Sequence, residues 1–141
     1  MTSGKVVGLL DGKICLKMRC YKCCLDTQMI LTPSDIERIS QKTRLKREDF
    51  AWFDGRYWRL KNVYGHCIFL DPITGQCKIY EIRPLGCQAY PVIEKNGVCM
   101  PDYIYCPYAH LISREEIIEG CKILRRIFKE LKEKPPEYPK F

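Results

Sequence analysis

The chain has 141 residues and a formal net charge of +7, with 46% hydrophobic and 29% charged residues. This length is typical of one domain, and the hydrophobic fraction suffices for a packed core, which excludes global disorder. No apolar run reaches the ~18–20 residues of a membrane-spanning helix. The apolar run Val6–Leu10 is too short for a secretory signal, so we expect a cytoplasmic protein with no membrane partner.

Ten of the 141 residues are cysteine, which is the main anomaly of the composition. In a reducing cytosol, such a density favours thiolate ligands for a metal ion or cluster. Disulfides are the alternative, because intracellular proteins of hyperthermophiles contain them. Four thiolates on one divalent ion contribute −2, so one such site lowers the formal charge from +7 to +5 and two lower it to +3. That mild basicity does not by itself indicate nucleic-acid binding.

The first predicted elements are one or two short strands within residues 5–19. Thr32 then has the properties of a helix N-cap, with Pro33 at the first helical position, and the helix is expected to run to about Lys42. A second short helix is predicted near residues 46–52.

The region from residue 56 to residue 80 is typical of strands. A turn at residues 71–76 predicts a hairpin between two strands, 67–70 and 77–80. In the simplest register Cys77 faces Leu70, whereas Cys67 lies on the other face, roughly 10 Å from Cys77. One metal ion would then not reach both cysteines unless the hairpin contains a bulge.

A second hairpin and a long helix are predicted in the C-terminal half. Asn96-Gly97 supplies the positive φ angles of a type I′ turn between strands 92–95 and 98–100. Ser113 and Glu116 match a capping box, and the apolar residues after them recur every three or four positions, which predicts an amphipathic helix.

These elements together predict an α+β fold: a small cysteine-rich metal-binding domain with short antiparallel hairpins, an early helix and a long C-terminal amphipathic helix. Residues 1–133 are expected to form this one domain. Residues 134–141 are expected to form an extended proline-rich tail.

The cysteine spacing is the strongest functional signal. The two-residue gap between Cys20 and Cys23 lets a tight turn point both sulfurs at one ion, about 2.3 Å from each. Redox dithiols share this spacing, but they do not require further cysteines. Cys23 and Cys24 point opposite ways on an extended backbone, so they serve different centres or one of them does not bind. The expected metal ligands are Cys15, Cys20, Cys23, Cys24, Cys67, Cys77, Cys87 and Cys106, enough for two four-coordinate sites or for one cluster plus an ion.

The two other cysteines are expected to be structural. Cys121 lies on the apolar stripe of the last helix, and Cys99 closely follows the Asn-Gly turn. His66 and His110 could complete a metal site, although solvent exposure is the simpler interpretation. Arg83 could bind an anion or substrate, and we favour neutralisation of a thiolate site.

An aromatic and basic stretch, residues 52–59, has the composition of a base-stacking surface. We favour the alternative interpretation, a strand whose aromatic side chains pack inward. A nucleic-acid partner is therefore not favoured, whereas a metal ion or cluster is expected and a protein partner is an open alternative.

The cysteines and their neighbours resemble a known family. The residues that carry the resemblance are Cys20-x-x-Cys23-Cys24, then Cys67-Ile68-Phe69-Leu70, then Gly75-x-Cys77-x-Ile79-Tyr80-x-x-Arg83-Pro84-x-x-Cys87-x-Ala89-Tyr90-Pro91, and finally Cys106-Pro107. This pattern, over about residues 15–107, resembles the YkgJ-type cysteine-cluster family, described as a zinc- or iron-chelating domain, with flagellin N-methylase in its wider circle. The resemblance implies cysteine-bound metal. The family's first cysteine falls on Lys17 here, and Cys15 stands two residues earlier.

Three classes of function fit these observations. The first is a cysteine-thiolate protein that binds zinc, iron or an iron–sulfur cluster, because sulfur ligands suit all of these. The second is an iron–sulfur enzyme of methyl or group transfer, which the resemblance to flagellin N-methylase suggests. The third is a zinc-stabilised module that binds nucleic acid or protein. The sequence contains no Gly-rich cofactor loop, and it does not decide whether the protein is an enzyme.

Overall fold

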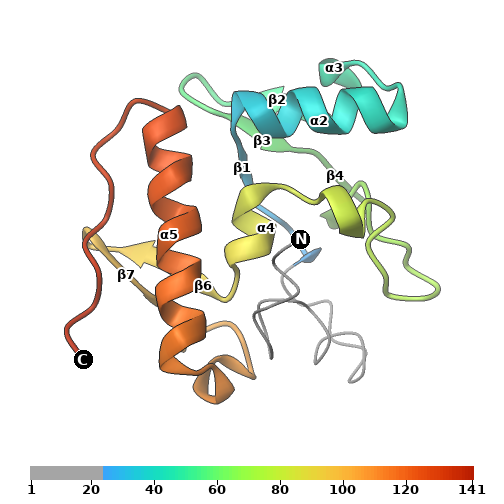
Figure 1. Cartoon of the computed structure of the whole chain (residues 1–141). Helices are drawn as coiled ribbons and strands as arrows, with labels where there is room; N and C mark the ends of the chain where they lie inside the picture. Colours follow the sequence, from blue (N-terminus) through green and yellow to red (C-terminus); the bar gives the residue numbers. More distant parts are fainter. Residues whose placement is uncertain (1–23) are drawn as a thin grey trace.

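The computed structural model describes residues 24–141 (Figure 1). The fold is α+β, as predicted. Its elements in chain order are β1 (Ile30–Leu31), α2 (Pro33–Thr43), α3 (Arg47–Phe50), β2 (Ala51–Phe53), β3 (Trp58–Leu60), β4 (Asn62–Val63), β5 (His66–Cys67), a 3-10 turn (Tyr80–Ile82), α4 (Leu85–Ala89), β6 (Val92–Lys95), β7 (Val98–Pro101), a second 3-10 turn (Ala109–Leu111) and α5 (Arg114–Glu130).

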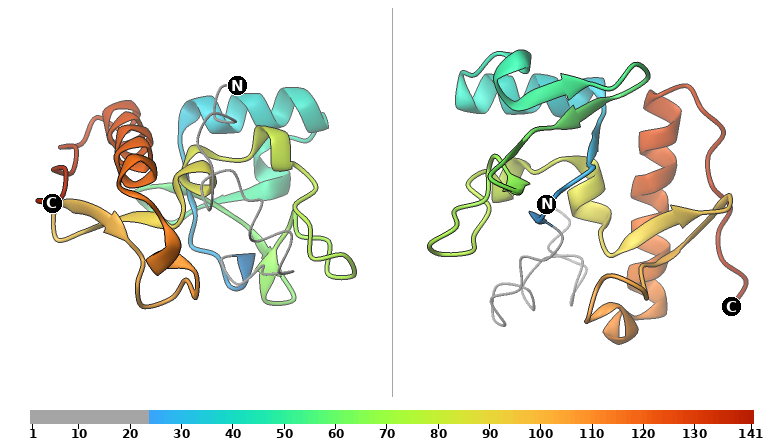
Figure 2. Two further views of the ribbon diagram at one scale, coloured as in Figure 1. Left: turned by 60° about the horizontal axis from the view of Figure 1, so that its bottom comes forward. Right: turned by 180° about the vertical axis from the view of Figure 1, so that it is seen from behind.

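Two hydrophobic cores divide these elements. One core lies between α2 and the antiparallel sheet β1-β3-β2, and it contains the buried side chains of Leu31, Ile39, Phe50 and Leu60. The other lies between α5 and the β6–β7 hairpin. The short helix α4 stands between the two groups and contacts both α5 and β1 (Figures 1 and 2).

The predicted start of α2 is confirmed. The Thr32 hydroxyl accepts a hydrogen bond from the Asp35 amide at 3.1 Å, and the Asp35 carboxylate accepts one from the Thr32 amide at 2.9 Å. Pro33 occupies the first turn, where its missing N–H leaves no helix bond unmade. The helix ends at Arg44, whose φ of 63° places it in the left-handed region.

Asp35 also holds α4 in place. Its side chain is 0% exposed, and Oδ1 accepts hydrogen bonds from the Leu85 amide and from the Arg38 guanidinium, both at 2.9 Å. Arg38 in turn donates to the carbonyl oxygens of Ile82 and Arg83. One buried carboxylate therefore caps α2 and fixes the start of α4, which carries Cys87.

The predicted hairpin between residues 67–70 and 77–80 is largely wrong. β5 pairs with β4, with Asn62 opposite Cys67, because the chain turns directly after Cys67 and the Leu70 amide donates to the Cys67 carbonyl at 2.9 Å. What remains is a single antiparallel bridge between Leu70 and Cys77, in the register that the sequence predicted.

The prediction that the aromatic side chains of residues 52–59 pack inward is wrong for two of them. Trp52 is 43% exposed and Phe53 is 52% exposed, because both lie on β2 at the edge of the sheet. Trp58 is half-buried. The centroid of its ring lies 5.5 Å from the centroid of the Phe53 ring and 4.0 Å from Cζ of Arg47.

The C-terminal half follows its prediction closely. Asn96 and Gly97 have φ angles of 54° and 82° between β6 and β7, as a type I′ turn requires. The Ser113–Glu116 capping box begins α5. Gly120 lets the helix approach the hairpin, since a Cβ there would lie 2.6 Å from a methyl carbon of Val92.

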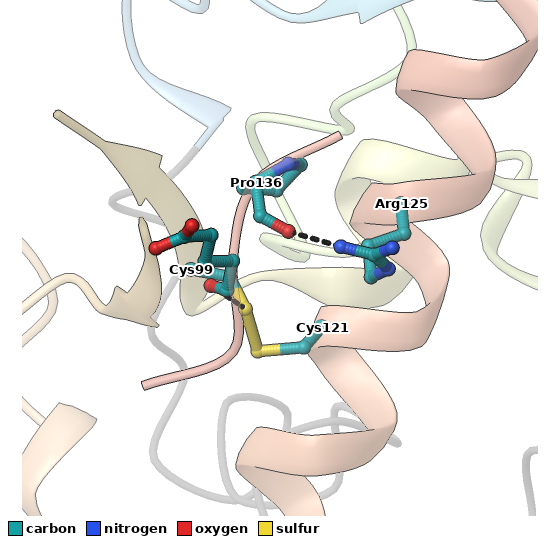
Figure 3. Close-up of a disulfide and its surroundings, with 5 residues drawn as sticks. Cys99, Cys121, Arg125 and Pro136 are labelled. Atoms are coloured by element: carbon teal, nitrogen blue, oxygen red, sulfur yellow. Dashed lines mark hydrogen bonds between the residues drawn. A yellow bond between two sulfur atoms is a disulfide. The ribbon is translucent and has the colours of Figure 1, made fainter. Parts of the chain in front are cut away.

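A disulfide joins Cys99 of β7 to Cys121 of α5 (Figure 3). Both residues are fully buried, so the prediction that they are structural is confirmed, although the sequence did not indicate that they bond to each other. Metal ligation was expected to be the main role of the cysteines, with disulfides as the alternative. For Cys99 and Cys121 the structure shows the alternative.

The C-terminal tail runs beside β7 and covers the disulfide (Figure 3). The Cys99 amide donates to the Glu137 carbonyl at 2.9 Å, and the Glu137 amide donates to the Gly97 carbonyl at 2.7 Å. Arg125 of α5 donates to the Pro136 carbonyl at 2.5 Å. The Cys99 sulfur lies 3.2 Å from the Glu137 carbonyl oxygen, a contact without a hydrogen because the sulfur is in a disulfide.

The disulfide makes a testable contribution to stability. It closes a loop with a sequence separation of 22 residues, and loops of this size give about 3 kcal/mol in the chain-entropy model. The double variant Cys99→Ala/Cys121→Ala should lose about that much free energy of unfolding in urea titrations. Wild-type protein titrated with urea in the presence of a strong thiol reductant should have the same free energy of unfolding as the double variant. Equal stability of oxidised wild type and the double variant would contradict this role.

The Asp35 contacts predict a second loss of stability. Asp35→Asn should lower the free energy of unfolding by about 2–3 kcal/mol, because the amide of asparagine has one acceptor oxygen and therefore leaves the buried Thr32 amide or the buried Leu85 amide without its partner. Thr32→Ala is the matched control, since it removes one N-cap hydroxyl of α2 and leaves the Leu85 contact; it should cost about 1 kcal/mol. Similar losses for the two variants would show that Asp35 acts as a cap alone.

Candidate metal centre

Three of the eight expected ligands, Cys15, Cys20 and Cys23, lie outside the described residues. The other five come from separate segments of the fold: Cys24, Cys67 in β5, Cys77, Cys87 in α4, and Cys106 after β7. Cys67 is 6% exposed and Cys106 is 9% exposed, whereas the other three are half-buried.

A long-range strand contact brings the Cys24 segment to β5. Leu25 and His66 form an antiparallel bridge, and the Asp26 amide donates to the Gly65 carbonyl at 2.7 Å. Cys24 directly precedes this bridge, in a 3-10 conformation, and Cys67 directly follows His66. Both cysteines also pack on the same hydrophobic core. Two expected ligands from distant parts of the sequence therefore lie in the same region of the fold.

The side chain of Asn62 secures this arrangement from β4. Its Nδ2 donates to the Thr27 carbonyl and its Oδ1 accepts from the Thr27 amide, both at 2.9 Å. The two bonds satisfy the backbone of the segment that follows Cys24, in the same way as a neighbouring strand would. The Cys24 segment is thus bound on β5 through Leu25 and on β4 through Thr27.

The turn after Cys67 aims a backbone donor at its sulfur. The Phe69 amide donates to the Cys67 Sγ, with a nitrogen–sulfur distance of 3.5 Å. Hydrogen bonds to the charged form of a side chain favour that form, so this amide stabilises a thiolate. The same kind of contact orients and tunes metal-bound groups from the second shell of a site. The local chemistry at Cys67 therefore fits a metal-binding thiolate.

Cys77 belongs to the same corner of the fold. Its bridge to Leu70, together with the donation from the Lys78 amide to the Phe69 carbonyl at 2.7 Å, ties it to the turn that follows Cys67. Cys24, Cys67 and Cys77 all pack against the core that contains Phe69. Cys87 lies on α4, whose buried residues pack into the second core.

Within residues 24–141, no three side chains of Cys, His, Asp or Glu stand in positions to hold one metal ion together. The five cysteines are therefore brought together in part: Cys24, Cys67 and Cys77 lie at one hydrophobic core, and the set as a whole is not gathered around one point. A site with four protein ligands needs residues outside this range or a rearrangement on metal binding.

The other residues singled out in the sequence have identifiable contacts. His66 is half-buried, with Nδ1 2.9 Å from the Cys67 carbonyl oxygen, and His110 is exposed, as expected for it. The Arg83 guanidinium donates to the Tyr80 carbonyl at 2.8 Å and lies 4.2 Å from the centroid of the Tyr80 ring. Its neutralising role stays a prediction.

Two functional elements were not found from the sequence. The link from Asp35 to α4 could not be distinguished from an ordinary first-turn acid, because its second partner is distant in the sequence. The N–H···S contact at Cys67 depends on a turn that was predicted as a strand. The local Cys67–Leu70 sequence carries no turn signal such as Gly, Pro or Asn.

None of the helices in the described part of the chain combines the length and the apolar character needed to span a bilayer. No solved structure matches the chain. An uncharacterized protein of Methanocaldococcus jannaschii is 37% identical over 87 aligned residues, which cover 55% of this chain and 47% of that protein. The match thus spans about half the length of this relative.

The family comparison agrees with the cysteine pattern. The model of the CxxCxxCC family, described as a "putative zinc- or iron-chelating domain", matches residues 14–107. This match covers more than half of the chain and includes every cysteine of the predicted ligand set. The chain therefore belongs to the CxxCxxCC family of cysteine-cluster domains.

Proposed function

We propose that the protein binds zinc or iron through cysteine thiolates, with Cys24 and Cys67 as the central pair of ligands. The observation that supports this proposal is the bridge between Leu25 and His66, because each of the two cysteines is the sequence neighbour of one bridged residue. The amide of Phe69, which donates to the Cys67 sulfur, supports a thiolate at that position. Membership of a zinc- or iron-chelating family supports the same chemistry.

The remaining ligands are proposed from both parts of the chain. As residues 24–141 are arranged, one ion takes at most two ligands from them. A four-thiolate centre with two ligands from residues 24–141 needs two more from residues 1–23, so two such centres would need four. Residues 1–23 contain three cysteines: Cys15, Cys20 and Cys23. We therefore favour one centre. A second centre would have to draw Cys77, Cys87 and Cys106 together as metal binds.

The bound metal would contribute to the protein in one of two ways. Zinc in a closed four-thiolate site supplies folding stability, whereas an iron–sulfur cluster supplies electron transfer. The chain itself supplies soft sulfur ligands, an amide donor at Cys67 and a buried carboxylate that holds α4. Arg83, next to the Cys87 helix, is proposed to offset negative charge at the centre.

A second candidate function rests on the exposed aromatic side chains of β2. Trp52 and Phe53 are exposed, and Phe53 contacts Trp58, whose ring also carries the Arg47 guanidinium. Aromatic residues and arginine are enriched at protein interfaces. The nearby guanidinium groups of Arg47 and Arg59 are paired with Glu48 and Asp54, which weakens the case for nucleic acid. A zinc-stabilised module with a protein partner is therefore the alternative. Methyl or group transfer stays a prediction from the family resemblance.

Metal analysis tests the proposal directly. Protein purified without oxygen should contain about one metal centre per chain, that is about one equivalent of zinc or of mononuclear iron, or about two to four equivalents of iron in an iron–sulfur cluster, and Cys67→Ser should lose most of the metal. Zinc protein should be colourless, whereas iron–sulfur protein should be brown. The Cys99→Ala/Cys121→Ala variant is the control for lost stability, because it should unfold more easily and still retain the metal.

Two results would contradict this function. One is a folded wild-type protein that binds neither metal when either is supplied in excess. The other is a Cys67→Ser or Cys24→Ser variant with the metal content and the melting temperature of the wild type.

A further inference from the structure

A groove with a volume of about 510 Å³ opens where four parts of the fold meet. Its walls come from residues 25–30, from Gly86 of α4, from β6 and from the C-terminal half of α5. These elements lie around the centre of the molecule in Figure 1. Volumes of roughly 300–1,000 Å³ are typical of small-molecule sites.

The walls of the groove are apolar and adaptable. Ile93, Leu124 and Phe128 line it, together with Met29. Met29 lies directly on the backbone of α4, since a Cβ on Gly86 would come 2.3 Å from its sulfur. Methionine is unbranched and polarisable, so it can adjust to the shape of a bound molecule.

The charges along the groove have one sign. Among its described lining residues, the side chains charged at neutral pH are Asp26 and Glu94, both exposed and both acidic. One guanidinium touches a lining residue: Arg59 donates to the Gln28 carbonyl and is itself paired with Asp54. This acidic border stands out on a chain with a formal charge of +7. A cation is therefore favoured over an anion here.

The groove also borders the segments that carry cysteines. Leu25, Gly86 and Tyr105 line it, and each is the sequence neighbour of an expected ligand: Cys24, Cys87 and Cys106 respectively. A molecule in the groove would lie beside three of the segments from which a metal centre would be built.

We propose that this groove binds a small molecule with an apolar body and one positive charge, such as an aromatic or aliphatic amine. The apolar body packs against Met29, Leu124 and Phe128, and the ammonium group lies near Asp26 and Glu94. Binding itself does not depend on the proposed metal. The position of the bound amine next to a metal centre does rest on the proposed function.

Three probes with the same carbon skeleton test the proposal: 4-phenylbutylamine, 4-phenylbutanol and 4-phenylbutyrate. Titrations of the full chain, followed by nuclear magnetic resonance at low salt, should give the tightest binding for the amine and the weakest for the acid. Each exposed carboxylate should contribute about 1.4-fold to fivefold, so the two together should favour the amine over the alcohol by about 2-fold to 25-fold, and over the acid by more. Shifts should centre on residues 25–30, β6 and α5.

Variants separate charge from shape. Asp26→Asn and Glu94→Gln should each reduce the preference for the amine and leave binding of the alcohol unchanged. Glu94 also accepts a hydrogen bond from the Gly97 amide, so Glu94→Gln could disturb the turn. Asp26→Asn is the safer variant, because asparagine tolerates the positive φ of 44° at position 26. Ile93→Trp should fill the groove and abolish binding of all three probes. Glu37→Gln, an exposed acid on α2, is the control and should change nothing.

Three results would overturn the proposal: equal affinity for the three probes, no binding of any of them at millimolar concentration, or shifts that centre elsewhere. Repeating the titration after metal removal keeps the two proposals apart. Amine binding by a chain that never takes up metal would refute the metal function alone. Metal uptake by a chain that binds no amine would refute the groove alone.

Discussion

The candidate centre depends on the antiparallel bridge between Leu25 and His66. This one contact brings Leu25, and with it the neighbouring Cys24, to β5, where Cys67 follows His66. A shift of this pairing would therefore change the distance between the two cysteines. The Asn62 side chain reinforces the contact by bonding both backbone groups of Thr27.

Two further constraints hold the elements around this bridge. The Asp35 carboxylate joins the first turn of α2 to the start of α4, so that Cys87 is carried on a short helix with an anchored N-terminus. The Cys99–Cys121 disulfide fixes the hairpin on α5 at the other side of the molecule. The metal proposed for the centre would therefore act on a chain that also contains two hydrophobic cores and a disulfide. The cysteines are thus divided between two tasks, a structural cross-link and the proposed ligation.

The parts of the fold that were predictable from the sequence are those that local chemistry determines. The N-cap at Thr32, the capping box at Ser113 and the Asn96-Gly97 turn need only near neighbours, and all three are as predicted. The hairpin predicted for residues 67–80 is wrong because β5 pairs with β4 instead. The choice between two pairing partners depends on tertiary contacts, which the periodicity of a single segment does not contain. The pairing of Cys99 with Cys121 and the second partner of Asp35 are likewise tertiary contacts. The family resemblance predicted that the cysteines are ligands, but it could not reveal which of them are neighbours in space.

X-ray absorption at the metal edge of protein purified without oxygen is the most direct measurement of the central claim. The account predicts a shell of sulfur atoms, at about 2.3 Å if the metal is zinc. It also predicts that this shell loses sulfur when Cys24 or Cys67 is replaced by serine. A shell of nitrogen or oxygen atoms at about 2.0–2.1 Å, unaffected by either replacement, would contradict it.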